Sequence, residues 1–339
     1  MIEAIVSELK CRAHEISHPV STIYFGGGTP SILERGELQL LMKTVNDQYD
    51  LSSLAEVTLE ANPEDIHSVH LESWKELGIN RLSIGVQSLK SDDLRWMNRA
   101  HNAAESLNAI FLAKQAGFQN ISVDLMYGLP QLSIQEWENH INEILQLRVQ
   151  HISSYCLTVE KNTALHSWVK NGKITISSEE KQAEQFNRMA ELFIANGFEH
   201  YEISNFALPG FRAVHNSNYW KGATYLGVGP SAHSYDGQRR RWNIANNAVY
   251  MKQEDGAWFE SELLTAKDKW NELILVGLRT AEGVDLKRLS SIDELDTEFE
   301  RSLLKFERSG WITRDSSALK LTSEGKLRAD YISSELFKT

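Results

Sequence analysis

The sequence predicts an α/β fold in which parallel strands alternate with helices and close towards a full or partial barrel, followed by a small C-terminal domain. Short apolar, β-branched runs recur through the first two-thirds of the 339 residues, and longer segments with helical spacing separate them. From about residue 260 the pattern changes to helices followed by a short hairpin. This second pattern is typical of a winged-helix-like α+β domain.

The predicted strands begin a few tens of residues apart, which fits a succession of βα units. They are the runs at 20–25, 55–61, 81–86, 121–127 and 151–157. The best-marked helix follows Ser133 and Glu136, which form a capping box ahead of an apolar stripe that begins at Trp137. An amphipathic helix over residues 2–16 opens the chain, and no strand precedes it. The first strand present would then have an unpaired neighbour position, which suggests a missing βα start.

We divide the chain into three regions on these patterns. They are the barrel (1–198), a region of strands and ordered loops rich in aromatic residues, Asn and Gly (199–259), and the winged-helix-like domain (260–339). In the last region we expect helices at 266–280 and 294–309, a hairpin of 311–313 with 319–321, and a final helix from about Thr322.

The formal net charge of −11 argues against nucleic-acid binding, which needs clustered positive charge. The one basic run, Arg239–Arg241, is short; we interpret it as a solvated loop, with an anchor for ligand carboxylates as the alternative. Only two cysteines occur, Cys11 and Cys156, so we do not expect a disulfide framework. We expect the protein to be cytoplasmic, because the cytosol is a reducing compartment. We expect both cysteines to be small buried apolar side chains.

No apolar run reaches the roughly 20 residues that a membrane-spanning helix needs. The opening residues carry Glu3 and Glu8 among apolar side chains, which is unlike a signal peptide. Peripheral membrane association and the oligomeric state cannot be read from the sequence.

Polar and glycine residues gather at the expected carboxyl ends of the strands, where active sites of parallel barrels form. Gly26–Gly28 follow the first strand directly, and glycines there let a ligand approach the backbone closely, although a tight turn would also explain them. Four further polar residues lie at or near the next strand ends: Glu60, Gln87, Arg99 and Asp124. Each alone would be a salt bridge at the edge of the core, but together they indicate a polar ligand site.

Six segments carry a resemblance to a known family: GGGTPS, LEANPEDI, GINRLSIGVQS, DLMYGLP, HYEISNFA and HNSNYW. They resemble the heme-chaperone (HemW) branch of the oxygen-independent coproporphyrinogen oxidases, over about residues 20–250. The resemblance implies a radical S-adenosylmethionine protein with a partial (βα)6 TIM-like barrel, a [4Fe–4S] cluster and bound S-adenosylmethionine. By motif it assigns contacts with S-adenosylmethionine to Gly27, Gly28, Thr29, Glu60, Gln87, Arg99 and Asp124. It assigns no catalytic residue.

Two motifs favour the heme-chaperone branch over the true oxidases. One is YEISNFA, from Tyr201 to Ala207. The other is the pattern H-N-x-x-Y-W, which the resemblance links to heme and which comprises His215, Asn216, Tyr219 and Trp220. Histidine is a common axial ligand of heme iron, and aromatic rings pack on a porphyrin face. The alternative is a hydrogen-bonded structural histidine with both aromatic rings in the core.

The family's C-x-x-x-C-x-x-C motif, whose thiolates hold the cluster, is absent from these 339 residues. We therefore assign no metal-ligating residues in this chain. In the family this motif follows the first strand, so we infer that about 30 residues, one βα unit, are missing before Met1. A real, cluster-free descendant is the rival interpretation.

Three functions follow, and whether the chain is an enzyme stays open among them. The leading hypothesis is a heme chaperone that binds heme and transfers it to an acceptor protein, with S-adenosylmethionine and the cluster in the full-length form. The second is an oxygen-independent coproporphyrinogen III oxidase of porphyrin biosynthesis. The third is a cluster-free binding module.

Overall fold

A computed structural model describes residues 1–252 and 258–338. The chain divides into two compact units. We call Tyr24–Ile32 with Val57–Ala213 the barrel unit, and Met1–Ile23, Leu33–Glu56 and Val214–Thr339 the composite unit. The predicted boundaries at 198 and 259 stay predictions, and residues 253–257 of the predicted middle region lie outside the described residues.

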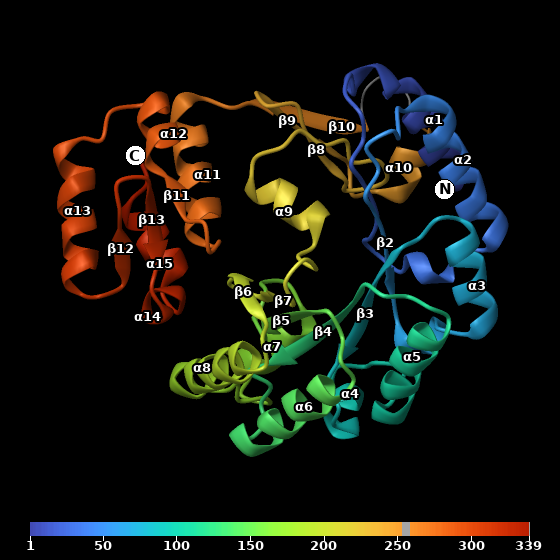
Figure 1. The fold of residues 1–339 in the computed structure, drawn as a ribbon, viewed down its shortest axis with the longest axis horizontal. Coiled ribbons are helices and arrows are strands. Elements are labelled where there is room, and N and C mark those ends of the chain that lie inside the picture. Colours follow the sequence, from blue (N-terminus) through green and yellow to red (C-terminus); the bar gives the residue numbers. More distant parts are fainter. Residues whose placement is uncertain (253–257, 339) are drawn as a thin grey trace. The chain divides into compact units, whose positions relative to one another are not determined.

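One seven-stranded sheet has the strand order β1-β2-β3-β4-β5-β7-β6 (Figure 1). Its strands are β1 (Thr22–Phe25), β2 (Glu56–Ala61), β3 (Arg81–Gln87), β4 (Ile121–Tyr127), β5 (His151–Cys156), β6 (Glu199–Glu202) and β7 (Asn205–Ala207). Strands β2 to β5 pair in parallel, whereas β7 joins β5 and β6 in the antiparallel sense. All five strands predicted for the barrel are confirmed, with ends that differ by one or two residues.

Helices of the barrel unit alternate with these strands, and α5, α6 and α8 lie outside the curved sheet (Figure 1). The helices and 3-10 turns are η2 (Pro30–Ile32), η3 (Pro63–Asp65), α3 (Ser68–Glu76), α4 (Ser91–Trp96), α5 (Ala103–Gln115), α6 (Ile134–Gln146), α7 (Ala164–Lys170) and α8 (Glu179–Ala195). The predicted capping box of α6 is confirmed, since Ser133 Oγ accepts from the Glu136 amide at 3.2 Å and the Glu136 carboxylate accepts from the Ser133 amide at 2.8 Å. Trp137 is fully buried on the inner face of that helix.

The composite unit combines the first residues of the chain with a second, three-stranded antiparallel sheet of order β10-β9-β8. Its elements before the C-terminal region are α1 (Ile2–Cys11), η1 (Ala13–Glu15), α2 (Arg35–Gln48), α9 (Val214–Trp220), β8 (His233–Tyr235), β9 (Arg239–Asn243), α10 (Asn247–Lys252) and β10 (Phe259–Leu263). The helix predicted over residues 2–16 ends at Cys11, because Arg12 leaves helical geometry and a 3-10 turn follows.

The run Arg239–Arg241 was expected as a solvated loop, and that expectation is wrong. These residues begin strand β9, which pairs with β8 on one side and β10 on the other. Arg240 forms an ion pair with Glu272 at 2.8 Å, and the Arg241 guanidinium lies 3.6 Å from the centre of the Phe259 ring. Long arginine stems can cover apolar surface while their charged ends find partners, so a charged run is compatible with a strand.

The C-terminal region has the predicted order of helices, hairpin and final helices. Its elements are α11 (Ala266–Leu278), β11 (Val284–Asp285), α12 (Leu286–Ile292), α13 (Thr297–Arg308), β12 (Ile312–Arg314), β13 (Ala318–Leu321), α14 (Ser323–Lys326) and α15 (Ala329–Glu335). The sheet also contains β11, in the order β11-β13-β12, which the sequence did not predict. Buried Trp270 anchors the end of the chain, because its Nε1 donates to the Leu336 carbonyl at 3.1 Å within a shared apolar core.

Among the described residues, no helix combines the length and the apolar character that crossing a membrane requires.

Candidate functional site

The glycine turn after β1 is open on the side where a ligand would approach. Gly27 and Gly28 have φ angles of +74° and +66°, a region that residues with a Cβ rarely adopt. A Cβ built on either glycine meets no atom within 4 Å. Gly26 differs, because a Cβ there would overlap the Tyr24 ring. Backbone conformation therefore demands glycine at 27 and 28, and the space beside them is free of protein atoms.

Glu60, at the end of β2, holds this turn. The Tyr24 hydroxyl donates to Glu60 Oε1 at 2.7 Å, and the Gly27 amide donates to Oε2 at 3.0 Å. Burial raises the pKa of Tyr24, and the neighbouring Glu60 charge raises it further, so the phenol stays protonated and acts as a donor. The predicted residues Gly27 and Glu60 thus form one hydrogen-bonded group with Tyr24, which the sequence analysis missed.

Arg99 and Gln87 meet at the end of β3. Arg99 Nη2 donates to Asn62 Oδ1 at 2.8 Å and to the Gly85 carbonyl at 3.1 Å. A Cβ built on Gly85 would lie 3.1 Å from both Arg99 Nη2 and Gln87 Nε2, so these two polar groups converge on the same glycine. Gln87 has a φ of +64°, a conformation uncommon for a residue other than glycine and frequent at functional sites.

Asp124 lies in the middle of β4 and faces the hydroxyl of Ser83, which is 3.3 Å from both carboxylate oxygens. Burial raises the pKa of Asp124 to about 6, against the lowering effect of Ser153 and Arg81. The Glu60 carboxylate also acts on Asp124, so these two predicted residues are electrostatic neighbours. Thr29 stands at the start of η2, where its carbonyl accepts from the Ile32 amide at 3.3 Å.

Two further residues brace this part of the site and were missed by the sequence analysis. The His101 ring is buried, with Nδ1 2.8 Å from Glu64 Oε2 and Nε2 3.2 Å from the Val86 carbonyl. Glu64 belongs to the quoted segment LEANPEDI, as does Asn62. That segment was the available signal, but a side-chain contact between residues 37 positions apart has no signature in one sequence.

The described residues do not provide a site for an iron–sulfur cluster. Cys11 is exposed at the end of α1, which corrects the expectation that both cysteines are buried; it falls on the outer side of the last helical turn. Cys156 is half-buried, and burial raises the pKa of its thiol, which disfavours the thiolate that a metal needs. Within residues 1–252 and 258–338, no group of three or more His, Cys, Asp or Glu side chains is arranged to hold a metal ion.

The H-N-x-x-Y-W motif forms helix α9 of the composite unit, which holds His215, Asn216, Tyr219 and Trp220. The His215 ring has partners at both nitrogens, Thr22 Oγ1 at 2.8 Å from Nδ1 and Tyr219 Oη at 3.0 Å from Nε2. The rings of His215 and Tyr219 are perpendicular, with centres 5.0 Å apart. Tyr219 is 39% exposed and Trp220 is partly exposed, whereas the two hydrogen bonds of His215 are also what a structural histidine would make, so both interpretations of the motif stay predictions.

The beginning of α9 is tied to strand β2. The carboxylate of Glu56, which is 2% exposed, accepts from the Val214 amide at 2.9 Å and from the His215 amide at 3.0 Å. A carboxylate at these first amides satisfies donors that the helix itself leaves unpaired. Trp220 Nε1 is buried and has no hydrogen-bond partner within the described part of the chain.

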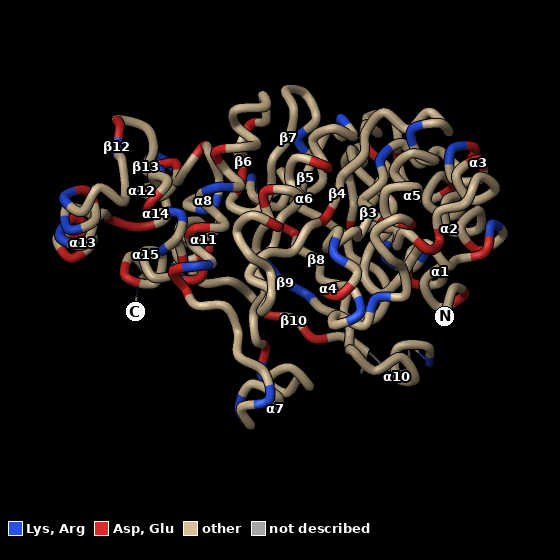
Figure 2. Tube along the Cα trace, turned by 90° about the horizontal axis from the view of Figure 1, so that it is seen from below, with Lys and Arg blue, Asp and Glu red and all other residues tan. Residues whose placement is uncertain are grey.

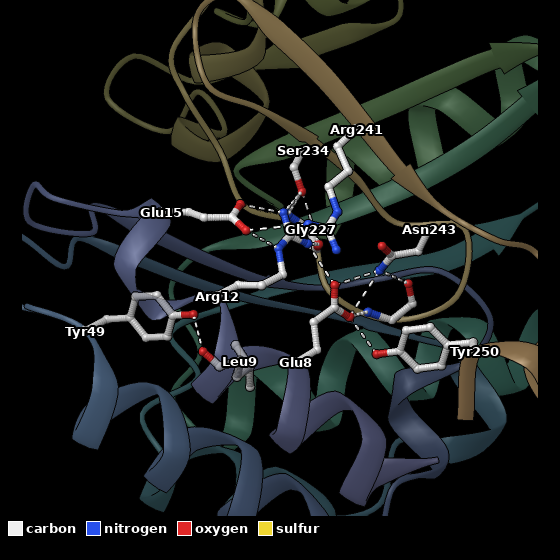
Figure 3. A network of polar contacts seen from close by, with 11 residues as sticks. Glu8, Leu9, Arg12, Glu15, Tyr49, Gly227, Ser234, Arg241, Asn243 and Tyr250 are labelled. Atoms are coloured by element: carbon white, nitrogen blue, oxygen red, sulfur yellow. Dashed lines mark hydrogen bonds and ion pairs between the residues drawn. The ribbon is translucent and has the colours of Figure 1, made fainter. Parts of the chain in front are cut away.

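A buried polar network joins α1 to the sheet that follows α9 (Figure 3). The Glu8 carboxylate, 1% exposed, accepts from Arg12 at 2.7 Å, Asn243 at 2.8 Å, Tyr250 at 2.6 Å and the Gly229 amide at 3.0 Å. Arg12 in turn forms a two-bond pair with the Glu15 carboxylate and donates to the Gly227 carbonyl and the Ser234 hydroxyl. These contacts fix α1 as part of the unit that carries α9.

Comparison with known proteins assigns the class. Residues 2–144 match the Radical SAM superfamily, and residues 264–328 match the HemN C-terminal domain. The solved structure of coproporphyrinogen III oxidase (HemN) from Escherichia coli, a radical SAM enzyme, superposes with a TM-score of 0.83 at 21% identity, covering 99% of this chain and 82% of that chain. The fold is therefore that of a radical SAM protein with a partial TIM barrel and a C-terminal domain, as predicted.

Similarity to two proteins of known name identifies the family within this class. The chain is 35% identical over 314 residues to the heme chaperone HemW of Bacillus subtilis, covering 91% of this chain and 83% of that protein. It is 32% identical over 291 residues to the heme chaperone HemW of Lactococcus lactis, covering 86% of this chain and 76% of that protein. The chain belongs to the HemW family, which favours the heme-chaperone branch over the oxidase and the cluster-free module.

Proposed function

We propose that this chain is a heme chaperone, which binds heme at helix α9 and passes it to an acceptor protein in the cytoplasm. The observation that carries the proposal is the placement of His215 and Tyr219 on a helix outside the core, in a chain 35% identical to a HemW protein. An imidazole can ligate heme iron, and exposed aromatic rings can pack on the porphyrin. Asn216 and Trp220 complete the proposed heme site.

The same proposal includes binding of S-adenosylmethionine in the barrel unit. One side of the ligand would be lined by Gly27, Gly28 and Thr29. The two glycines leave open space beside the backbone, and the Gly27 amide is hydrogen-bonded to Glu60. Glu60, Gln87 and Asp124 would bind its polar groups, and Arg99 would pair with its carboxylate. In radical SAM proteins the bond that is cleaved is a carbon–sulfur bond of this cofactor's sulfonium.

Titration of hemin into the purified chain tests the heme site. We expect His215→Ala to weaken hemin binding at least tenfold and to remove the Soret band of a histidine-ligated heme, since the proposed axial ligand is lost. His14→Ala is the matched control, because His14 is an exposed histidine of the same unit whose Nδ1 lies 3.0 Å from the nearby Cys11 carbonyl. Hemin binding that is equal in His215→Ala and the unaltered chain would contradict the proposed site.

A further inference from the structure

The His215 ring is held in place by two hydroxyl groups that differ in kind. Thr22 Oγ1 lies 2.8 Å from Nδ1, and Tyr219 Oη lies 3.0 Å from Nε2. A nitrogen lone pair that accepts a hydrogen bond is not available to a metal ion at the same time. An iron atom that binds this ring must therefore displace one of the two hydroxyl groups.

The two hydroxyl groups are not equally easy to displace. Thr22 begins strand β1, and its branched side chain has few rotamers. Tyr219 lies on the seven-residue helix α9 and is 39% exposed. Its ring contacts Tyr225 edge-on, with centres 4.6 Å apart. Rotation of an exposed side chain frees Nε2, whereas freeing Nδ1 would disturb a strand, so Nε2 is the nitrogen that can open to a ligand.

Proton positions agree with this assignment. A tyrosine phenol ordinarily keeps its proton near neutral pH, so the Tyr219 hydroxyl can donate to Nε2 across the 3.0 Å contact. With Nε2 as acceptor, Nδ1 carries the proton and donates to Thr22 Oγ1. Histidines that bind metals usually donate the other ring N–H to an oxygen in this way, which fixes the ring and makes the ligating nitrogen more basic.

The backbone beneath His215 is also fixed. The buried Glu56 carboxylate accepts from the amides of Val214 and His215 at 2.9 and 3.0 Å. The residue is therefore held at its amide by Glu56 and at Nδ1 by Thr22, while Nε2 has the hydroxyl of the exposed Tyr219 as a partner.

We propose that Thr22 is a positioning residue that presents His215 Nε2 to heme iron, and that Tyr219 competes with the iron for this nitrogen. The inference rests on the proposed heme site at α9. In the heme-free protein the Tyr219 hydroxyl occupies Nε2, and binding of iron releases it. Heme affinity thus depends on the difference in free energy between the bond from iron to His215 Nε2 and the hydrogen bond from Tyr219 to the same nitrogen.

Hemin titrations of three variants test the proposal. Tyr219→Phe should bind hemin about fivefold more tightly, because the net value of the competing hydrogen bond is about that factor. Thr22→Val should bind at least tenfold more weakly and lower the iron–histidine stretching frequency of the ferrous form, because the Nδ1 partner is lost. Thr22→Ser should restore both properties. Tyr225→Phe removes a neighbouring hydroxyl but keeps the ring that contacts Tyr219, and this variant should bind like the unaltered chain.

A measurement without heme separates the two levels of the proposal. In ¹⁵N NMR spectra of the heme-free chain, Thr22→Val should change the tautomer of His215, whereas Thr22→Ser should not. If His215→Ala abolishes hemin binding but Thr22→Val and Tyr219→Phe behave like the unaltered chain, the inference is wrong and the heme site stands. If His215→Ala binds hemin normally, the heme site and this inference both fall.

Discussion

At the scale of single residues, the proposed cofactor pocket depends on groups that already serve one another. Glu60 accepts hydrogen bonds from Tyr24 and from the Gly27 amide, so the carboxylate shapes the glycine turn before any ligand arrives. The sequence was sufficient to find Gly27 and Glu60, because local motifs mark the ends of strands. It was insufficient for Tyr24 and His101, because their importance comes from contacts between residues distant in sequence.

Replacement of Glu60 tests this arrangement. Glu60→Gln keeps the shape but replaces one carboxylate oxygen by an N–H₂ group, which then faces either the Tyr24 hydroxyl or the Gly27 amide, so one charge-assisted hydrogen bond is lost. We expect S-adenosylmethionine binding, measured by isothermal titration calorimetry, to weaken at least tenfold. Glu72→Gln, on the exposed face of α3, is the control and should bind normally. Unchanged affinity in Glu60→Gln would show that this carboxylate does not shape the pocket.

At the scale of elements, short apolar runs predicted the strands of the barrel correctly, whereas a run of charged residues led to a strand being interpreted as a loop. All five barrel strands were predicted, because short runs rich in apolar and β-branched residues mark them between the helical segments. Strand β9 was mistaken for a loop because three arginines open it, although their side chains find partners such as Glu272. Strand β11 was missed because it spans only Val284–Asp285 and leaves no period to detect.

Helix α1 is the element whose role was least visible in the sequence, and its attachment can be measured. Glu8→Gln replaces a carboxylate oxygen that faces buried donors by an N–H₂ group, and should lower the free energy of unfolding by about 3 kcal/mol. Glu3→Gln, exposed on the same helix, should change it by less than about 0.5 kcal/mol. Urea unfolding followed by tryptophan fluorescence gives both values. Similar losses in the two variants would show that the buried network adds no stability.

At the scale of the whole molecule, the pattern of charge and the discontinuous composite unit are the main features. Helix α13 carries both acidic and basic residues (Figure 2), with Glu298 and Glu300 in its first turn and Lys305 and Arg308 in its last turn. The net charge of −11 is the basis for the prediction that the protein does not bind nucleic acid, and that statement stays a prediction. The sequence did not indicate that residues 1–23 join residues 214–339 in one unit, because no local pattern reports such distant pairing.

The stability of the molecule should depend on pH through its buried groups. Burial raises the pKa of Asp124 from its ordinary value of 3.8 to about 6, so the folded state binds this proton more tightly than the unfolded state. This contribution is fully present below about pH 4 and is lost as the pH rises towards 6. Burial lowers the pKa of His140 to about 4, which has the opposite effect, so a single curve mixes the two.

The difference between the unaltered chain and Asp124→Asn isolates the carboxyl group. Between pH 4 and pH 7 the variant should gain on the order of 2–3 kcal/mol in unfolding free energy relative to the unaltered chain. Urea unfolding at a series of pH values measures this difference, and Asp92→Asn, an exposed carboxylate of the same unit, controls for the loss of a charge. A difference that stays constant with pH would mean that Asp124 ionises alike in both states.

The network around Glu8 also has a consequence in time. Its partners Asn243 and Tyr250 lie 235 and 242 positions further along the chain. A ribosome adds about 5–20 residues per second, so roughly 10–50 seconds pass between the synthesis of Glu8 and that of its last partner. Throughout that interval the carboxylate must stay hydrated, and α1 can pack only against early elements such as α2. Completion of the unit that carries α9 therefore follows the synthesis of its first helix by tens of seconds.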